Sequence, residues 1–172
     1  MLKVDLGQLD REGSVAVETR VSAGDALWAD SQIPWAGDIY FRLQATHAGT
    51  GEIVARGTAT GTLNQECRRC LQPVETHFVG NLTIVFVAEE AHKGEGEGDS
   101  GGYAFKGTDA VLDMSDAVRE EVVLAMNSYA VCRADCRGFC STCGADLNAG
   151  DCGCREEGTD PRWAALQNLK DD

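Results

Sequence analysis

Long apolar runs are missing from this sequence of 172 residues. No segment approaches the ~18 consecutive apolar residues that a transmembrane helix needs, so the sequence predicts no membrane-spanning helix and no membrane partner. The first residues, MLKVDLGQLDREGS, also lack the basic stretch followed by an apolar stretch that marks a secretory signal. The expected location of the protein is therefore the cytoplasm.

Basic residues are also in short supply, since 15 Lys and Arg face 28 Asp and Glu and leave a net charge of −13. Ten acidic and three basic residues lie between 89 and 121, so this segment alone carries −7. Phosphate binding draws mainly on Lys and Arg, which disfavours a broad nucleic-acid surface. An acidic surface suits a basic protein partner better, although the same charge could serve solubility alone.

Histidine is scarce as well, with only His47, His77 and His92 in the chain. A catalytic zinc site keeps one coordination position open and usually includes histidine or carboxylate ligands. None of the three histidines stands beside the cysteine-rich stretch described next. We therefore expect a protein without catalytic residues, that is, not an enzyme.

Cysteine, in contrast, is abundant: the chain has eight. Two lie in ECRRCLQP, and six are crowded into CRADCRGFCSTCGADLNAGDCGC, residues 132–154. In a reducing compartment disulfides are rare, and closely spaced cysteine pairs more often bind metal or carry out redox chemistry. All eight are candidate ligands of structural zinc: Cys67, Cys70, Cys132, Cys136, Cys140, Cys143, Cys152 and Cys154.

The spacing suggests how these ligands divide. CSTCG and CGC lie close enough in sequence to form one compact local site, similar to a zinc knuckle. Cys132 and Cys136, four residues apart, could complete a second site with the distant pair in ECRRC. Two alternatives remain open at this point. In the first, only one ion binds, and Cys132 and Cys136 are plain buried thiols. In the second, Cys136 replaces Cys154 in the local set.

Arginines beside the thiols allow two further interpretations. Arg68 and Arg69 would stabilise thiolates, which serves metal binding and a redox enzyme acting through Cys67 and Cys70 alike. The thioredoxin-like βαβ pattern expected of such an enzyme is missing. The basic residues near the thiols could instead form a local RNA-binding patch; they are Arg68, Arg69, Arg133, Arg137 and Arg155.

The first half of the chain has the period-two alternation of half-buried antiparallel strands. It is visible in SVAVETRV, IYFRLQATH, GEIVARGTATGTL and THFVGNLTIVFVAE, and ECRRCLQP falls at a hairpin tip between the last two. A helix capped by Ser115 follows, with Val118, Val122 and Ala125 on its apolar side. TDPRWAALQNLK predicts a short final helix.

These patterns predict an α+β fold, with an antiparallel β-sheet domain, packed helices and a small zinc-bound C-terminal module. The expected divisions are an antiparallel β domain over 1–88 and a flexible, acidic, Gly-rich insertion over 89–108. Residues 109–172 then hold a helix, the cysteine-rich zinc module and the C-terminal helix.

Three stretches together resemble the YceD family, the large ribosomal RNA subunit accumulation proteins of bacteria and plastids. They are ECRRCLQPVE after a strand, EEVVLAMNSYAVCRADCRGFCSTCGADLNAGDCGC, and DPRWAALQNLK, so the resemblance covers nearly the whole chain. One departure is NSYAV before Cys132, where the family is often rich in proline and leucine. This departure leaves open how the chain enters the second metal site.

The resemblance implies a role in ribosome assembly and in the accumulation of large-subunit rRNA, and it implies no catalytic activity. Genes of the family often neighbour the gene of a small, basic large-subunit ribosomal protein, which makes such a protein a candidate partner. Contact with rRNA would be direct or indirect. The alternative functions are direct rRNA binding by the zinc knuckle and, less favoured, thiol redox catalysis.

Overall fold

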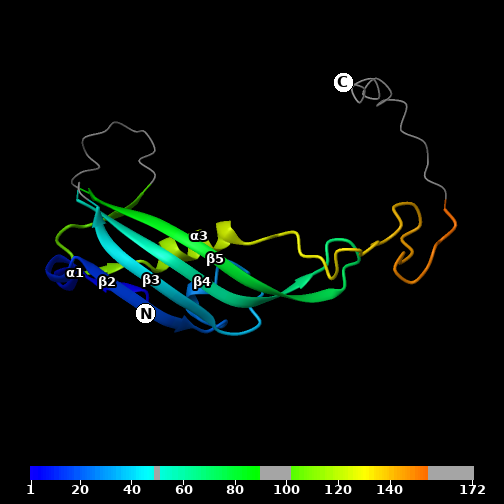
Figure 1. Ribbon diagram of the computed structural model, residues 1–172, viewed down its shortest axis with the longest axis horizontal. Coiled ribbons are helices and arrows are strands. Elements are labelled where there is room, and N and C mark those ends of the chain that lie inside the picture. Colours follow the sequence, from blue (N-terminus) through cyan, green and yellow to red (C-terminus); the bar gives the residue numbers. More distant parts are fainter. Residues whose placement is uncertain (49–50, 90–101, 155–172) are drawn as a thin grey trace, which may run out of the picture.

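The computed structural model describes residues 1–48, 51–89 and 102–154, and shows an elongated molecule with a sheet at one end and the cysteine-rich segment at the other (Figure 1). None of the helices in these ranges is long and apolar enough to cross a membrane. The elements are β1 (Lys3–Asp5), α1 (Leu6–Glu12), β2 (Ser14–Val21), the 3-10 helix η1 (Ala26–Trp28), β3 (Ile39–Ala48), β4 (Glu52–Glu66), β5 (Pro73–Ala88), β6 (Tyr103–Phe105), β7 (Val111–Asp113) and α3 (Ser115–Ala125).

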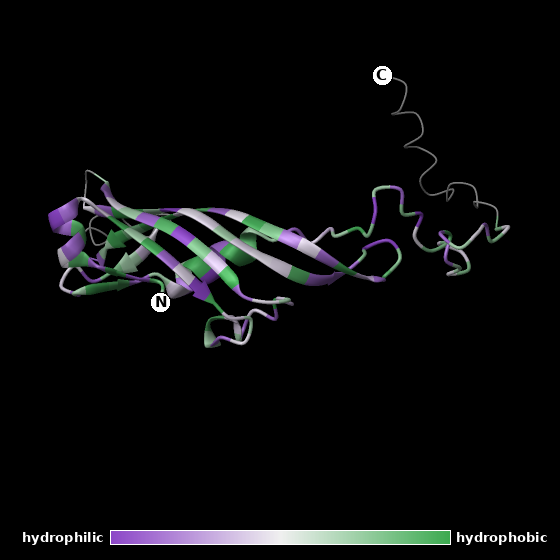
Figure 2. Cartoon of the chain, turned by 60° about the horizontal axis from the view of Figure 1, so that its bottom comes forward, coloured by the Kyte–Doolittle hydropathy of each residue, from purple (hydrophilic) through white to green (hydrophobic). Residues whose placement is uncertain are grey.

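The main sheet has the order β2-β3-β4-β5-β6, and its first four strands are antiparallel. Hydrophilic and hydrophobic residues alternate along these strands as coloured bands (Figure 2). The predicted strands and their buried sides are confirmed, so the chain is mostly antiparallel β-structure with two α-helices in the described ranges. The buried side chains of the predicted sides are Val15, Val17, Val21, Ile39, Phe41, Leu43, Ala45, Phe78, Leu82, Ile84 and Phe86.

A glycine in the middle of β4 marks a close approach of two backbones. Gly57 pairs with Leu43 of β3, and a Cβ at this position would lie 2.0 Å from the carbonyl oxygen of Arg42. No side chain fits in that space, so the glycine that weakens the strand pattern in the sequence is required by the packing of β3 on β4.

Helix α3 covers the buried face of the sheet (Figure 1), where Ala117, Val118 and Val122 are buried. Two details differ from the prediction. Ser115 is the first helical residue rather than the cap, and its N–H donates to Oδ1 of Asp113 at 3.0 Å. Ala125 is exposed, because the helix ends there as the chain turns away from the sheet.

The predicted insertion, 89–108, contains one short strand near its end. Tyr103–Phe105 forms β6 and pairs in parallel with the end of β5. The Tyr103 ring lies 5.9 Å from the Phe86 ring, and its hydroxyl donates to Glu120 at 2.9 Å. Apolar and hydrogen-bonding contacts therefore fix this stretch despite its glycine-rich neighbours. Residues 90–101 of the insertion lie outside the described residues.

A second, two-stranded sheet is formed by segments that are distant in the sequence. β1 pairs with β7, from Lys3↔Asp113 to Asp5↔Val111, so residues after the insertion join the N-terminal strand in one small sheet. Helix α1, capped by the Asp5 side chain and ended by Gly13 at φ 75°, follows β1. Neither β1 nor α1 is predicted by the patterns in the sequence. The final helix predicted over 159–170 lies outside the described residues.

Candidate metal centres

The β4–β5 hairpin extends past the rest of the sheet and carries the first cysteine pair at its tip (Figure 1). Pairing runs as far as Glu66↔Pro73, which leaves Cys67–Gln72 as the turn. The Leu71 N–H donates to the Cys67 carbonyl at 2.8 Å, and the Cys67 N–H donates to the Gln72 carbonyl at 2.9 Å. Leu71 has φ 56°, a left-handed conformation that is unfavourable for leucine.

The same turn recurs at the second CxxC pair. The Gly144 N–H donates to the Cys140 carbonyl at 2.9 Å, and the Cys140 N–H donates to the Ala145 carbonyl at 2.8 Å. Gly144, at φ 72°, takes the place that Leu71 has in the first turn. The stretches CRRCLQ and CSTCGA thus fold into one type of loop, and each loop presents two thiols on the same side.

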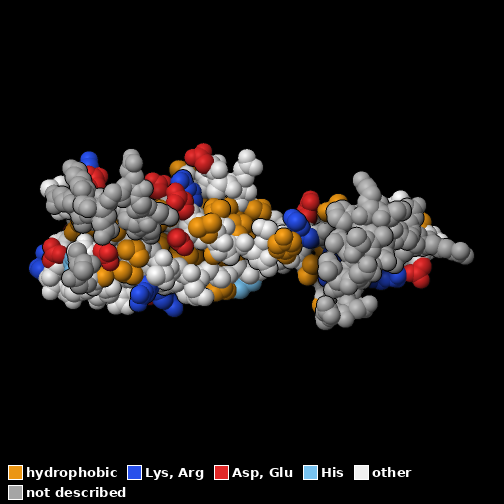
Figure 3. Space-filling view, turned by 90° about the horizontal axis from the view of Figure 1, so that it is seen from above, with side chains coloured by type: hydrophobic (Ala, Val, Ile, Leu, Met, Phe, Trp, Pro, Cys, Tyr) orange, Lys and Arg blue, Asp and Glu red, His pale blue; other side chains and the backbone are white. Residues whose placement is uncertain are grey.

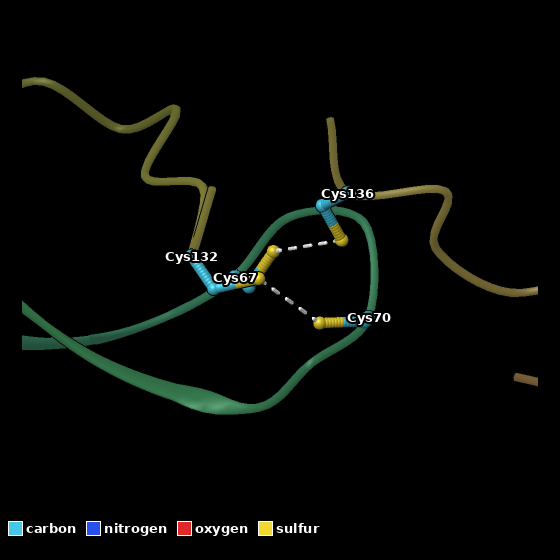
Figure 4. A group of neighbouring side chains, drawn as sticks. All are labelled: Cys67, Cys70, Cys132 and Cys136. Atoms are coloured by element: carbon cyan, nitrogen blue, oxygen red, sulfur yellow. Dashed lines mark hydrogen bonds between the residues drawn. The ribbon is translucent and has the colours of Figure 1, made fainter. Parts of the chain in front are cut away.

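The first group of sulfurs joins the hairpin tip to the chain after α3. The Sγ atoms of Cys67, Cys70, Cys132 and Cys136 all lie within 4.8 Å of one another and point toward a common centre (Figure 4). Two of the separations are 3.9 Å, between Cys67 and Cys136, and 3.7 Å, between Cys70 and Cys132. Zinc bonded to four sulfurs at ~2.3 Å requires sulfur–sulfur separations of about 3.8 Å. We call this group the joint site.

The second group is local in sequence. The Sγ atoms of Cys140, Cys143, Cys152 and Cys154 also lie within 4.8 Å of one another. Gly153 at φ 73° provides the turn that lets the CGC pair present both sulfurs to the CSTC pair. We call this group the terminal site. The structure thus brings the eight cysteines together in the two sets of four that their spacing suggested, with Cys136 in the joint site and Cys154 in the terminal site.

The two sites differ in burial. Three joint-site cysteines, Cys67, Cys70 and Cys136, are buried and form a small core of their own, separate from the core of the sheet. The terminal-site cysteines are half-buried or exposed. The fourth joint-site cysteine, Cys132, is exposed. A metal ion in the joint site would thus have three buried ligands, whereas the terminal site offers none.

The thiols of each site cannot all ionise together. Hydrogen bonding from the backbone N–H of Cys132 lowers the pKa of Cys67 to about 6. Removal from water and the neighbouring thiols raise the pKa of Cys132 to about 12. In the terminal site, backbone N–H groups of Cys143 and Thr142 lower the pKa of Cys140 to about 6, whereas hydrogen bonds to Cys143 and Cys152 raise that of Cys154 to about 12. Four adjacent thiolates require a compensating cation.

Arg69 attaches the cysteine-rich segment to the hairpin. Its guanidinium donates to the carbonyl oxygens of Ala134, at 3.2 Å, and Cys136, at 2.8 Å, and its own carbonyl accepts from the Phe139 N–H at 3.1 Å. Gly138, at φ 70°, packs directly on the same carbonyl, and a Cβ there would lie 2.5 Å from that oxygen.

Asn148 supports the joint site from the chain that follows it. Its Nδ2 donates to the Cys136 sulfur at 3.6 Å, and its Oδ1 accepts from the Arg137 N–H and the Arg133 guanidinium, both at 2.9 Å. A neutral amide donor to a thiolate stabilises its charge without competing for metal. Asn148 was not predicted from the sequence, because no pattern in DLNAGD indicates a contact with a cysteine twelve residues earlier.

The arginines proposed for RNA binding mostly have partners within the segment. Arg69 is engaged with carbonyls. Arg133 contacts Asp135 at 3.3 Å, and Arg137 pairs with Asp151. Arg68 lies over the Tyr129 ring, 5.1 Å from its centre. Arg155 lies outside the described residues.

The proposed redox pair is poorly placed for exchange with a substrate. Cys67 and Cys70 are both buried, and each has a cysteine of the following chain closer than 4 Å. A thiol that attacks an external disulfide has to be accessible.

A sequence profile of the large ribosomal RNA subunit accumulation protein YceD matches residues 55–170, from near the start of β4 to nearly the end of the chain. The chain belongs to the YceD family. The matched range contains most of β4, all of β5 and α3, and both groups of cysteines.

Curated relatives differ in how much of their sequence they share with this chain. An uncharacterized protein of Mycobacterium tuberculosis is 33% identical over 133 residues, which is 77% of this chain and 61% of the relative. The chloroplastic YCED homolog 1 proteins of Arabidopsis thaliana and Zea mays are 37% identical over 60 residues and 26% over 131. These ranges cover 35% and 61% of this chain, and 19% and 45% of the relatives. The chain thus spans about three fifths of its mycobacterial relatives. No solved structure matches.

The leucine in the left-handed position of the first turn leads to a testable expectation. Leu71→Gly is expected to raise the free energy of unfolding of the metal-loaded protein by about 1 kcal/mol, because glycine adopts positive φ without a steric penalty. The lost side chain contributes little burial, since Leu71 is 61% exposed. Denaturant unfolding measures the change. The reciprocal variant Gly144→Leu should destabilise, and a stabilising effect there would contradict this explanation.

Proposed function

We propose that this chain is a non-enzymatic factor of large-subunit ribosome biogenesis that supports the accumulation of large-subunit rRNA and holds two structural zinc ions. Family membership supports the biological role, because accumulation of large-subunit rRNA is what the family is named for. Two sets of four thiols support structural zinc, because each set provides a full tetrahedron with no position left for a substrate. The cytoplasm is the expected compartment.

The observation that carries the zinc assignment is the joint site. Its sulfur–sulfur separations of 3.7 and 3.9 Å match the edge of a zinc–sulfur tetrahedron, and they are far longer than the ~2.05 Å of a disulfide. The all-sulfur ligand set selects zinc over magnesium or calcium, which take oxygen ligands. Zinc bound to four thiolates carries two negative charges.

A basic ribosomal protein is the partner we favour. The net charge of −13 supports a protein that holds such a partner before it meets rRNA. Direct rRNA binding by the cysteine-rich segment has less support, because the side chains of Arg69, Arg133 and Arg137 are engaged in local contacts. Thiol redox catalysis has less support because Cys67 and Cys70 are buried.

Depletion of the protein tests the biological role. The ratio of large-subunit to small-subunit rRNA is expected to fall in depleted cells and to be restored by the wild-type chain. A Cys67→Ser chain, which lacks one joint-site ligand, should restore it poorly, whereas Cys67→Ser produced alongside the wild type should have no effect. An unchanged rRNA ratio on depletion would overturn the proposed role, whatever the metal content.

A further inference from the structure

A groove lies on the outer side of α3. It has a volume of about 470 Å³ and is formed between the start of the loop after η1 and the exposed side of the helix. The size falls within the range of ~300–1,000 Å³ typical of ligand pockets. We call it the α3 groove, and it is lined by Asp30, Ser31, Arg119, Glu120, Val123 and Leu124.

The apolar part of the α3 groove is unusual for the outer side of a helix. Ala117, Val118 and Val122 already supply the side that packs on the sheet. Val123 and Leu124 lie on the other side, with 44% and 77% of their surfaces exposed. Figure 3 shows one face of the molecule, on which hydrophobic side chains gather with acidic side chains near them. Neighbouring exposed apolar residues rimmed by charge are typical of a protein-binding surface.

The charge of the α3 groove is negative. Arg119 is its one basic lining residue, and this guanidinium pairs with Asp116 at 3.4 Å. Glu120 and Asp30 are the acidic lining residues, and Glu120 is held in place by the Tyr103 hydroxyl at 2.9 Å. Glu121 adds a further acidic residue on α3. An occupant that complements these groups carries positive charge beside an apolar side chain.

We propose that the α3 groove binds a cationic segment of a partner protein, which inserts an apolar side chain between the Asp30–Ser31 turn and Leu124. The sign of the charge decides among the occupants. RNA would bring phosphates against Asp30 and Glu120, and a second copy of this chain would bring the same acidic groups against each other. The inference deepens the proposed function and rests on it only in expecting a basic partner, since the groove supplies the surface that such a partner needs.

A synthetic amphipathic peptide of Lys, Leu and Ala, about 15 residues long, is the probe for this groove. Titrated into the full-length, metal-loaded, nitrogen-15-labelled protein, it is expected to shift the amide resonances of residues 30–31 and 119–124 saturably. The shifts should weaken between about 50 mM and about 500 mM salt, because screening reduces the attraction. A peptide with Glu at every Lys position should not bind.

Substitutions at two exposed leucines distinguish binding in the α3 groove from non-specific binding to exposed apolar side chains. Leu124→Ala is expected to weaken peptide binding about tenfold, because truncation removes apolar surface that the peptide buries. Leu71→Ala, the same change at the hairpin tip, should leave the affinity unchanged. Glu120→Gln should weaken binding while keeping an acceptor for Tyr103, and Glu75→Gln on the open face of the sheet should not.

Several outcomes would overturn the proposal. They are the absence of saturable binding, equal effects of Leu124→Ala and Leu71→Ala, and displacement of the peptide by an RNA oligonucleotide at the same resonances. Self-association lost in Leu124→Ala would assign the groove to a second copy. Shifts of residues 155–172 caused by Leu124→Ala in the free protein would assign it to the chain's own C-terminal segment. If the peptide binds as expected but depletion leaves the rRNA ratio unchanged, the proposed function would be overturned and the groove proposal would stand.

Discussion

Replacing Cys136 with serine is expected to reduce the zinc content of the purified protein from two ions per chain to one, and to release residues 126–154 from the hairpin tip. Cys136 is buried, and its sulfur lies 3.9 Å from that of Cys67. A serine hydroxyl is a poor zinc ligand, so the joint site would lose its tetrahedral set. Structural zinc binding contributes on the order of 10 kcal/mol, so little else would hold the segment in place.

Two measurements follow this change independently. Elemental analysis counts the zinc, and limited proteolysis between 126 and 154 reports release of the segment. The β-sheet signal in circular dichroism should persist, because the core of the sheet is separate from the cysteine core. This signal shows whether the variant has folded.

Cys154→Ser is the matched control for the same experiment. It should also lose one zinc ion, but the segment should stay attached, because Cys154 belongs to the terminal site. Wild-type protein with one zinc would limit metal to one site, and protein without zinc would overturn the assignment of both. Equal protease sensitivity of the two variants would contradict a specific role of the joint site in attachment.

Gly138→Ala is expected to weaken the attachment of the cysteine-rich segment by roughly 2–4 kcal/mol, because two penalties add. Alanine at φ 70° is strained, and its Cβ would lie 2.5 Å from the Arg69 carbonyl oxygen. That oxygen accepts the Phe139 N–H, so relief of the clash would break the hydrogen bond as well. Release of the segment with rising denaturant measures the loss.

Gly144→Ala separates the two penalties. Gly144 has φ 72°, but no atom lies within 4 Å of a Cβ built there. The Gly144→Ala variant is then expected to be destabilised only by the backbone strain of about 1 kcal/mol. If the two variants lose the same amount, the contact with Arg69 contributes nothing to attachment.

The sequence predicted most of the sheet, because strand alternation is a short-range pattern, and it suggested one division of the cysteines among alternatives that it left open. Strand alternation follows from one face being buried, and Phe41 and Leu43 are buried where the pattern placed them. The pairing of CRRC with CRADC followed from counting four ligands per zinc. The small elements were missed: three residues of β1 or β7 carry no periodicity, and their pairing is decided by tertiary contacts.

The residues that support the sites were not predictable in the same way. Gly138 and Asn148 act through contacts with Arg69 and Cys136, which are set by how the segment folds back on the hairpin. The Leu71 conformation had a sequence signal, because CRRCLQ aligned on CSTCGA places leucine over glycine. The α3 groove could not be foreseen, because Asp30 and Leu124 meet only through packing of the helix beside η1.

The two metal sites differ in the length of chain that each one closes. The terminal site takes all its ligands from 140–154, whereas the joint site links Cys67 to Cys136. Closing the longer loop costs about 1 kcal/mol more conformational entropy before any contact is gained. If both sites bind zinc as proposed, we therefore expect the terminal site to load more readily in an unfolded chain, and the joint site to load once the hairpin has formed. Occupancy of the joint site would then report that the hairpin and the cysteine-rich segment have come together.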